Sequence, residues 1–273
     1  MTISENSRYE SGLEGCVSPI EARAFLRLLG VPALPPSKAY LVRLIRAIYC
    51  RIPFQNLTML TRPRAAPAWN EIIEDMLSGL GGLCTTINPF VCAFLHQLGF
   101  RSVLLTSTML GRPDSHIAIG VWIENRLFWI DLANGFPYLM PLATDRAIAK
   151  EFAGFRYRLE PGGEWAKIYQ DVLGKEKTIC NQEVCLTPVH YSRFDEMRLL
   201  HYSDPSFGPF LRHIRLNRWE LENGYILRDN MVARFPGSWE KLGHDAVSRW
   251  IRTYFKDERL VKLYFQSIEA LPA

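Results

Sequence analysis

The spacing of apolar residues changes near residue 100, and no other feature of the sequence constrains the fold as strongly. Before this point, apolar side chains recur every three to four residues, as they do on the buried face of a helix. After it, short β-branched and aromatic runs are separated by turn residues, as in antiparallel strands. Because the two patterns follow one another and do not alternate, they predict an α+β fold.

Four helices are predicted in the first hundred residues. The first begins after Ser18, where Pro19 and Glu21 complete a capping box, and it ends at Gly30. The second begins at Ser37. Two further apolar stripes lie on either side of a loop, and they consist of Trp69, Ile72, Ile73, Met76 and Leu77 before it and Phe90, Val91, Phe94, Leu95 and Leu98 after it.

Short apolar runs after residue 100 predict a set of antiparallel strands. They lie at residues 103–109, 117–123, 127–130, 156–159 and 183–186. Turn-forming sequences such as Gly-Arg-Pro-Asp and Glu-Asn-Arg separate the first three runs. The chain from about residue 101 to residue 188 is therefore expected to form a small sheet or barrel.

A third region follows the sequence Tyr-Ser-Asp-Pro at residues 202–205. Two strand-like runs, at residues 214–221 and 225–228, come before an amphipathic helix that is expected to begin at Ser238. The basic side chains of that helix leave a membrane-surface or calmodulin-target role open. We favour a helix that packs on its own domain.

Composition and charge argue against several classes of protein. The net charge of +4 is spread along the chain, without the dense basic patch of a nucleic-acid binder. The longest apolar stretches, residues 89–95 and 117–123, are far shorter than the roughly 18 residues of a membrane span. The first residues of the chain also lack the apolar block of a secretory signal. We therefore expect a cytoplasmic protein with neither nucleic acid nor membrane as a partner.

The six cysteines match no metal-binding spacing, because the chain has no Cys-x-x-Cys pair and no matching histidines. Cys180 and Cys185 could form a bridge, but free thiols are expected in the cytoplasm. Cys92 lies on the apolar face of the fourth predicted helix and is expected in the core. Surface or capping roles are expected for five histidines, which are His96, His190, His201, His213 and His244.

Cys84 is the residue whose surroundings suggest reactivity. It follows Gly-Gly-Leu at residues 81–83 and stands where the fourth helix is expected to start. Unpaired backbone N–H groups and the helix dipole favour a thiolate there, and the glycines allow a substrate carbonyl to approach the backbone. The same N–H groups could stabilise an oxyanion. The alternative interpretation is a buried structural cysteine.

A hairpin would bring a histidine and an aspartate together. If residues 124 and 125 form a two-residue loop, Ile123 faces Arg126, and Asp131 is the same-face diagonal neighbour of His116. A loop one residue longer would turn the two side chains to opposite faces. His116 is further expected to begin its strand, at a sheet end that borders a cleft. With Cys84, the pair has the chemistry of a nucleophilic triad, in which histidine takes the thiol proton and aspartate orients the ring.

These residues lie within longer motifs that resemble the arylamine N-acetyltransferase family. The order and separations of the motifs fit the family over about residues 20–228. The motifs are Ile-Pro-Phe-Gln-Asn-Leu at 52–57, Gly-Gly-Leu-Cys at 81–84, Gly-Phe at 99–100, Ser-His at 115–116, Ile-Asp at 130–131, Tyr-Arg-Leu at 157–159 and Ser-Asp-Pro-Ser-Phe at 203–207.

The resemblance implies three regions around a core like that of cysteine proteases. Residues 1–100 would form an N-terminal helical bundle that carries the nucleophile. Residues 101–200 would form a central antiparallel β-barrel that carries histidine and aspartate, and residues 201–273 a C-terminal α/β lid.

The resemblance also implies a ping-pong acyl transfer. An acyl group would move from a CoA thioester such as acetyl-CoA to Cys84, and from there to an arylamine or a hydrazine. His116 would act as base and acid, Asp131 would orient it, and no cofactor would stay bound permanently. We expect Gly135 and basic side chains of the third region to contact the CoA. The expected substrate-binding residues are Phe54, Leu83, Asn134 and Phe136.

The chain departs from the family motifs at four positions near the expected site. Leu80 replaces the arginine before the glycine pair, and Thr86 replaces the glutamate two residues after the cysteine. Ala133 and Asn134 replace the glycine and phenylalanine that follow the aspartate motif. The support of the cysteine loop should therefore differ, and a polar Asn134 suggests a more polar or bulkier amine.

Three other functions remain open at this point. One is an amide synthase of secondary metabolism that uses a longer acyl chain or an acyl carrier protein. Another is a protease or transglutaminase-like enzyme, because the same triad attacks carboxamides. The third is a family homologue that no longer catalyses, since a fold does not guarantee a function.

Overall fold

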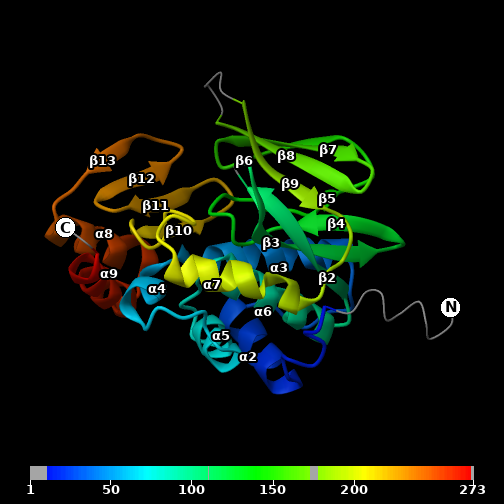
Figure 1. Cartoon of the computed structure of the whole chain (residues 1–273), viewed down its shortest axis with the longest axis horizontal. Coiled ribbons are helices and arrows are strands. Elements are labelled where there is room, and N and C mark those ends of the chain that lie inside the picture. The colour runs from blue at the N-terminus through cyan, green and yellow to red at the C-terminus, as the bar shows by residue number, and fades with distance from the viewer. Residues whose placement is uncertain (1–10, 110, 173–177, 272–273) are drawn as a thin grey trace.

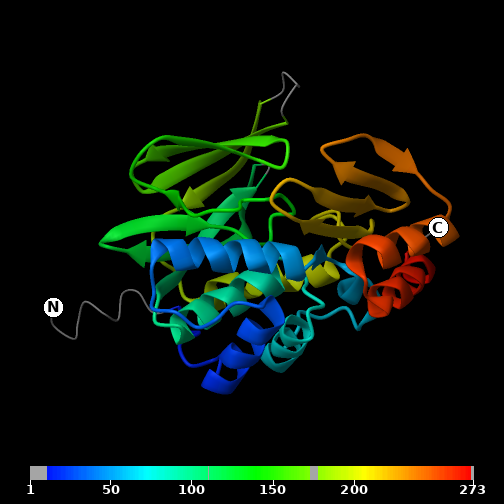
Figure 2. The same cartoon turned by 180° about the vertical axis from the view of Figure 1, so that it is seen from behind.

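The computed structural model describes residues 11–109, 111–172 and 178–271, which form two antiparallel sheets above a layer of helices (Figure 1). The helices of the first hundred residues are α2 (Pro19–Leu29), α3 (Lys38–Arg51), α4 (Leu57–Thr61), α5 (Trp69–Leu77) and α6 (Cys84–Gln97). Seen from behind, α3 runs beneath both sheets (Figure 2).

The start signals in the sequence place the first helices correctly. The Ser18 hydroxyl accepts a hydrogen bond from the backbone N–H of Glu21, and the Glu21 carboxylate accepts one from the backbone of Ser18, which is the predicted capping box. Gly30 ends α2 in the left-handed conformation, and Ser37 caps α3. The helix that begins at Cys84 is buried from its first residue through Leu95, so it forms the centre of the helical layer.

The larger sheet has eight strands in the order β5-β4-β3-β2-β9-β8-β7-β6, and all its pairings are antiparallel. It curls into a nearly closed barrel, which confirms the predicted α+β fold with a central barrel. The strands are β2 (Arg101–Met109), β3 (Arg112–Ile123), β4 (Arg126–Ile130), β5 (Leu142–Ala143), β6 (Ile148–Phe152), β7 (Phe155–Gly162), β8 (Trp165–Val172) and β9 (Thr178–Cys185).

The smaller sheet joins two distant parts of the chain. Its order is β1-β10-β11-β12-β13, and β1 (Phe54–Gln55) comes from between two N-terminal helices. The other members are β10 (Arg215–Trp219), β11 (Gly224–Arg228), β12 (Met231–Phe235) and β13 (Trp239–Lys241). Helices α8 (His244–Phe255) and α9 (Glu258–Ala270) pack against this sheet. In the sequence, η2 (Tyr191–Phe194) and α7 (Asp195–Ser203) come between β9 and β10.

The prediction that a helix begins at Ser238 is wrong about the starting residue. Trp239 pairs with Ala233 in the sheet, so the backbone there is extended, and the helix begins only after its N-cap, Gly243. Strands β12 and β13 and helix α9 were not predicted. The chain turns between the two helices at Lys256, which has a φ of 56°. None of the described helices is long and apolar enough to cross a lipid bilayer.

The Asn56 side chain connects the helical layer to the smaller sheet. It is fully buried, and its Nδ2 donates to the carbonyls of Phe210 and His213 at 2.5 and 2.7 Å. Its Oδ1 accepts a hydrogen bond from the backbone N–H of Arg215 at 2.7 Å. Three backbone groups of one segment are therefore satisfied by a single amide from another.

We predict that Asn56→Ala lowers the free energy of unfolding by about 3 kcal/mol, because the buried backbone groups lose their partners. Urea denaturation measures this value. Asn70→Ala, which removes an exposed amide from α5, is the matched control. A loss for Asn56→Ala that is no larger than the loss for the control would contradict this role.

Candidate active site

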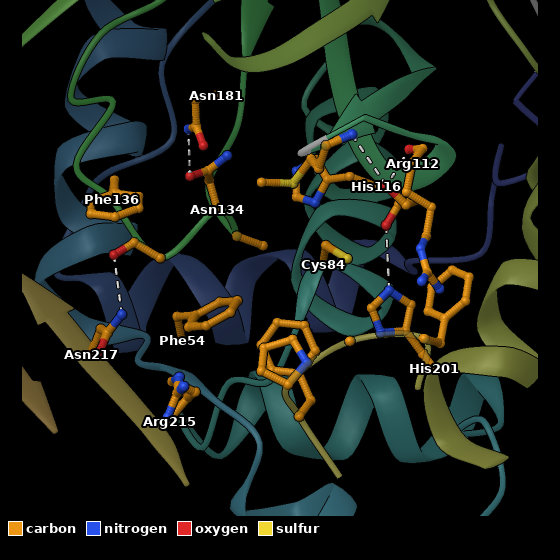
Figure 3. A pocket seen from close by; sticks show the side chains of 18 of the residues that line it. Phe54, Cys84, Arg112, His116, Asn134, Phe136, Asn181, His201, Arg215 and Asn217 are labelled. Atoms are coloured by element: carbon orange, nitrogen blue, oxygen red, sulfur yellow. Dashed lines mark hydrogen bonds between the residues drawn. The ribbon is translucent and has the colours of Figure 1, made fainter. Parts of the chain in front are cut away.

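A cavity of about 620 Å³ lies between the barrel and the smaller sheet, and Cys84 lines it. Cys84 occupies the middle of the view in Figure 3, with His116 on one side and Phe54 on the other. Asn134 and Asn181 lie on the barrel side of the cavity.

The loop before Cys84 is held by backbone hydrogen bonds to the segment around β1. The Gln55 N–H donates to the carbonyl of Gly82 at 3.0 Å, and the Gly82 N–H donates to the carbonyl of Pro53 at 3.3 Å. Gly81 has a φ of 71°, and a Cβ there would lie 2.0 Å from the Pro53 carbonyl oxygen. Only glycine fits this position, which explains the glycine pair that marks the loop in the sequence.

Other residues support the loop at the positions where the family motif is missing. The N–H groups of Leu80 and Gly81 both donate to the backbone carbonyl of Asp75. The Asp75 carboxylate is buried and forms a bidentate ion pair with Arg62, in which both N–O distances are 2.7 Å. The side chain of Leu80 packs into the apolar cluster beneath the smaller sheet.

Thr86 takes the place of the glutamate in the motif. It is buried, with its side chain packed close to Gly82. The hydroxyls of Thr85 and Tyr202 lie 3.2 Å apart, which links the start of α6 to α7. Packing and neutral hydrogen bonds therefore support this end of the loop.

The hairpin that carries His116 and Asp131 has the predicted register. Ile123 pairs with Arg126 across a two-residue loop, and the pairing continues to Ile119 and Ile130. His116 Nε2 lies 2.7 Å from Asp131 Oδ2, and both side chains are buried.

One detail of the prediction for this hairpin is wrong. Strand β3 begins at Arg112, so His116 lies well inside the strand, opposite Ser107 of β2, and does not begin it. The irregular pairing between Ser107 and Met109 accommodates the extra strand residues.

Asp131 receives more hydrogen bonds than the sequence suggested. Its Oδ1 accepts from the side-chain amide of Asn88 at 2.9 Å and from the backbone N–H of Ala133 at 3.1 Å, and its Oδ2 accepts from Gln182 at 3.0 Å. Asn88 lies four residues after Cys84, one turn along the same helix face, and this spacing could have identified it. Gln182 belongs to β9, and no sequence signal connects it with Asp131.

These contacts set the charges of the pair. Burial alone would raise the pKa of Asp131, but His116 and the amide hydrogen bonds lower it below its ordinary value. Burial alone would lower the pKa of His116, but the charge of Asp131 and the interaction with Cys84 raise it to about 10. The site therefore favours an imidazolium beside a carboxylate at neutral pH.

A second histidine lines the cavity, contrary to the surface or capping role expected for His201. The His201 side chain is buried on α7, with Nε2 3.3 Å from the backbone carbonyl of Ser115 (Figure 3). The rings of Phe207 and Phe210 lie against it. Burial lowers the pKa of His201 to about 4, so the ring is neutral at pH 7. This burial could not be predicted from the sequence, because it depends on how α7 packs against the barrel.

The other residues expected to contact substrate are divided between cavity and core. Phe54, Asn134, Gly135 and Phe136 line the cavity. Leu83 is buried among core residues, at the N-cap of α6, and is not among the described residues that line the cavity.

The remaining cysteines have the expected structural character. Cys92 is fully buried, and burial raises its pKa to about 12. Cys180 and Cys185 are free thiols. Within the described residues, no group of three or more His, Cys, Asp or Glu side chains is arranged to hold a metal ion.

Comparison with protein families assigns the chain to a class. A family model described as N-acetyltransferase matches residues 39–253. The chain belongs to this family, which confirms the resemblance of its motifs to arylamine N-acetyltransferases, and it is an acyltransferase of that type. A comparison with curated protein sequences gives no significant match.

Solved structures share the fold at low sequence identity. The arylamine N-acetyltransferase of Mycobacterium abscessus is 19% identical, with a TM-score of 0.81, over 91% of this chain and 94% of that one. The Nocardia farcinica arylamine N-acetyltransferase is 21% identical, with a TM-score of 0.78, over 90% and 92% of the two chains. An arylamine N-acetyltransferase of Bacillus cereus, which has a Cys-His-Glu catalytic triad, is 17% identical, with a TM-score of 0.72, over 86% and 97%.

The neutral state of His201 predicts a specific dependence of stability on pH. Its pKa of about 4 in the folded protein is below the value of about 6.5 expected in the unfolded chain, so the unfolded state binds more protons between these values. As the pH falls from 6.5 to 4, the free energy of unfolding of the wild type should therefore decrease by about 3 kcal/mol more than that of His201→Gln. Above pH 6.5 this contribution should not change with pH.

Urea denaturation of both proteins at several pH values measures this difference. His96→Gln, a change at an exposed helix position, is the matched control. Parallel pH dependences for wild type and His201→Gln would contradict a neutral, buried His201.

Proposed function

We propose that this acyltransferase moves an acetyl or other acyl group from a CoA thioester to an amine of the arylamine or hydrazine type, by a ping-pong mechanism. The strongest support is the position of Cys84 at the start of a buried helix, in the same cavity as the hydrogen-bonded His116 and Asp131. Phe54 and Gly135 in the cavity wall are proposed to contact the donor or the acceptor.

In the first half-reaction, Cys84 is the nucleophile. His116 holds the proton of the thiol, and the thiolate attacks the thioester carbonyl. The backbone N–H groups at the start of α6 stabilise the oxyanion, and the thiolate of CoA leaves with the proton that His116 returns. The product is an acyl group bonded to the Cys84 sulfur.

In the second half-reaction, the amine attacks the acyl carbonyl. His116 now accepts a proton from the amine nitrogen, and the Cys84 thiolate leaves, so the enzyme returns to its starting state. Asp131 keeps the imidazole in one orientation and stabilises its positive charge in both halves. Asn88 and Gln182 position Asp131 through their hydrogen bonds.

The barrel end of the cavity is polar, which favours a substrate that is more polar or bulkier than a simple arylamine. The Oδ1 of Asn134 accepts a hydrogen bond from Asn181 at 3.0 Å, whereas its Nδ2 is buried without a hydrogen-bond partner among the described residues. A phenylalanine would make this wall apolar. The polar wall favours a more polar or bulkier amine than a phenylalanine would. An amide synthase that uses a larger acyl chain, delivered by CoA or by a carrier protein, is the second candidate function.

We predict that the wild type gains the mass of one acyl group when it is mixed with acyl-CoA thioesters without an amine, and that Cys84→Ala gains none. Intact-protein mass spectrometry measures the adduct, and the preferred chain length separates the acetyltransferase from the amide synthase. Cys50→Ala, which removes a half-buried thiol elsewhere, is the control and should still be acylated. Equal adducts on wild type and Cys84→Ala would contradict the proposal.

A further inference from the structure

The charged residues that line the cavity have one sign. Arg112, Arg215 and Arg228 line it, and none of the described lining residues is acidic. Arg112 stacks on the ring of Phe207, with its guanidinium carbon 4.6 Å from the ring centroid, at the barrel side. Arg215 and Arg228 belong to the smaller sheet. A cavity with this distribution of charge attracts anions.

Arg215 and Arg228 form a cross-strand pair. They face each other in the antiparallel register of β10 and β11, so their side chains leave the same face of the sheet. Asn217, two residues after Arg215, shares that face and also lines the cavity. Like charges directly opposite each other destabilise a sheet, so this pairing has a cost that a bound anion would remove.

The described residues compensate the charges of the two arginines only in part. Among the described residues, the carboxylate paired with Arg215 is that of Asp229, at 3.8 Å, and Arg215 also donates a hydrogen bond to the carbonyl of Ile214. Arg228 packs over the ring of Trp239, with its guanidinium carbon 5.0 Å from the centroid, and has no ion pair with a described residue. Desolvation lowers the pKa of both arginines, and Asp229 opposes this effect only at Arg215.

We propose that Arg215 and Arg228 together bind an anionic group, a carboxylate or a phosphate, carried by a substrate of the acyl transfer. Paired guanidinium groups present several N–H donors to such a group and hold it with charge-assisted hydrogen bonds. This inference rests on the proposed function and names the chemistry of its substrate. The anion has two possible sources, the phosphates of CoA and a carboxylate on the amine.

The first experiment tests the donor as the source of the anion. The rate of Cys84 acylation by acetyl-CoA is compared with the rate for the acetyl thioester of N-acetylcysteamine, which has no phosphate. If the arginines bind phosphate, Arg228→Gln and Arg215→Gln should each lower the ratio of the acetyl-CoA rate to the N-acetylcysteamine thioester rate by about ten- to a hundredfold. Arg234→Gln, which removes the same charge from the opposite face of the sheet, is the matched control and should leave the ratio unchanged.

The second experiment tests the acceptor. Acetyl-Cys84 enzyme, prepared with the neutral thioester, is mixed with 4-aminobenzoate or with the uncharged 4-aminobenzamide. The measured quantity is the deacylation rate with 4-aminobenzoate divided by the rate with 4-aminobenzamide. If this ratio falls at least tenfold in the arginine variants and not in Arg234→Gln, the result supports the inference and assigns the anion to the amine. If neither the donor ratio nor the acceptor ratio changes by more than twofold in the double variant, the inference is overturned.

A binding measurement separates failure of this inference from failure of the proposed function. Calorimetric titration of Cys84→Ala with CoA and with 4-aminobenzoate needs no catalysis, and melting temperatures confirm that each variant is folded. At least tenfold weaker binding of either ligand after Arg228→Gln supports the anion site, even if Cys84 is never acylated. No binding of either ligand, or equal binding with and without Arg228, overturns the site.

Discussion

The hydrogen bond between His116 and Asp131 is the interaction on which the rest of the site depends. A carboxylate with no exposed surface is costly unless its oxygens are paired, and the amides of Asn88 and Gln182 complete that pairing. These partners come from α6, β3 and β9, and Asp131 itself directly follows β4, so the helical layer and the barrel must be correctly packed for the charge to be tolerated. The same packing brings the imidazole to the thiol of Cys84.

The short strand β1 has a comparable role on the other side of the cavity. It pairs with β10 in the smaller sheet, and its backbone also holds the loop that leads to Cys84. Movement of the smaller sheet would therefore shift both the cysteine loop and Arg215. One continuous set of hydrogen bonds thus connects the nucleophile with the proposed anion site.

Local signals in the sequence predicted the features that depend on neighbouring residues. The capping box at Ser18 and the two-residue loop after Ile123 each follow from short-range geometry, and the loop was sufficient to place Asp131 beside His116. Features that depend on distant packing were missed. The burial of His201 and the hydrogen bond from Gln182 to Asp131 both arise from contacts between segments far apart in the chain. The extended backbone at Trp239 was missed for a different reason: it belongs to a local hairpin with β12, whose apolar pattern also fits the start of a helix.

The protonation state of His116 tests the central claim most directly. Its imidazole nitrogens can be followed by ¹⁵N nuclear magnetic resonance as the pH is raised, with His116→Gln used to assign the signals. The account predicts that His116 stays protonated through pH 8 and loses its proton only as the pH approaches about 10. A His116 ring that is already neutral at pH 7 would contradict the charged pair from which the proposed chemistry follows.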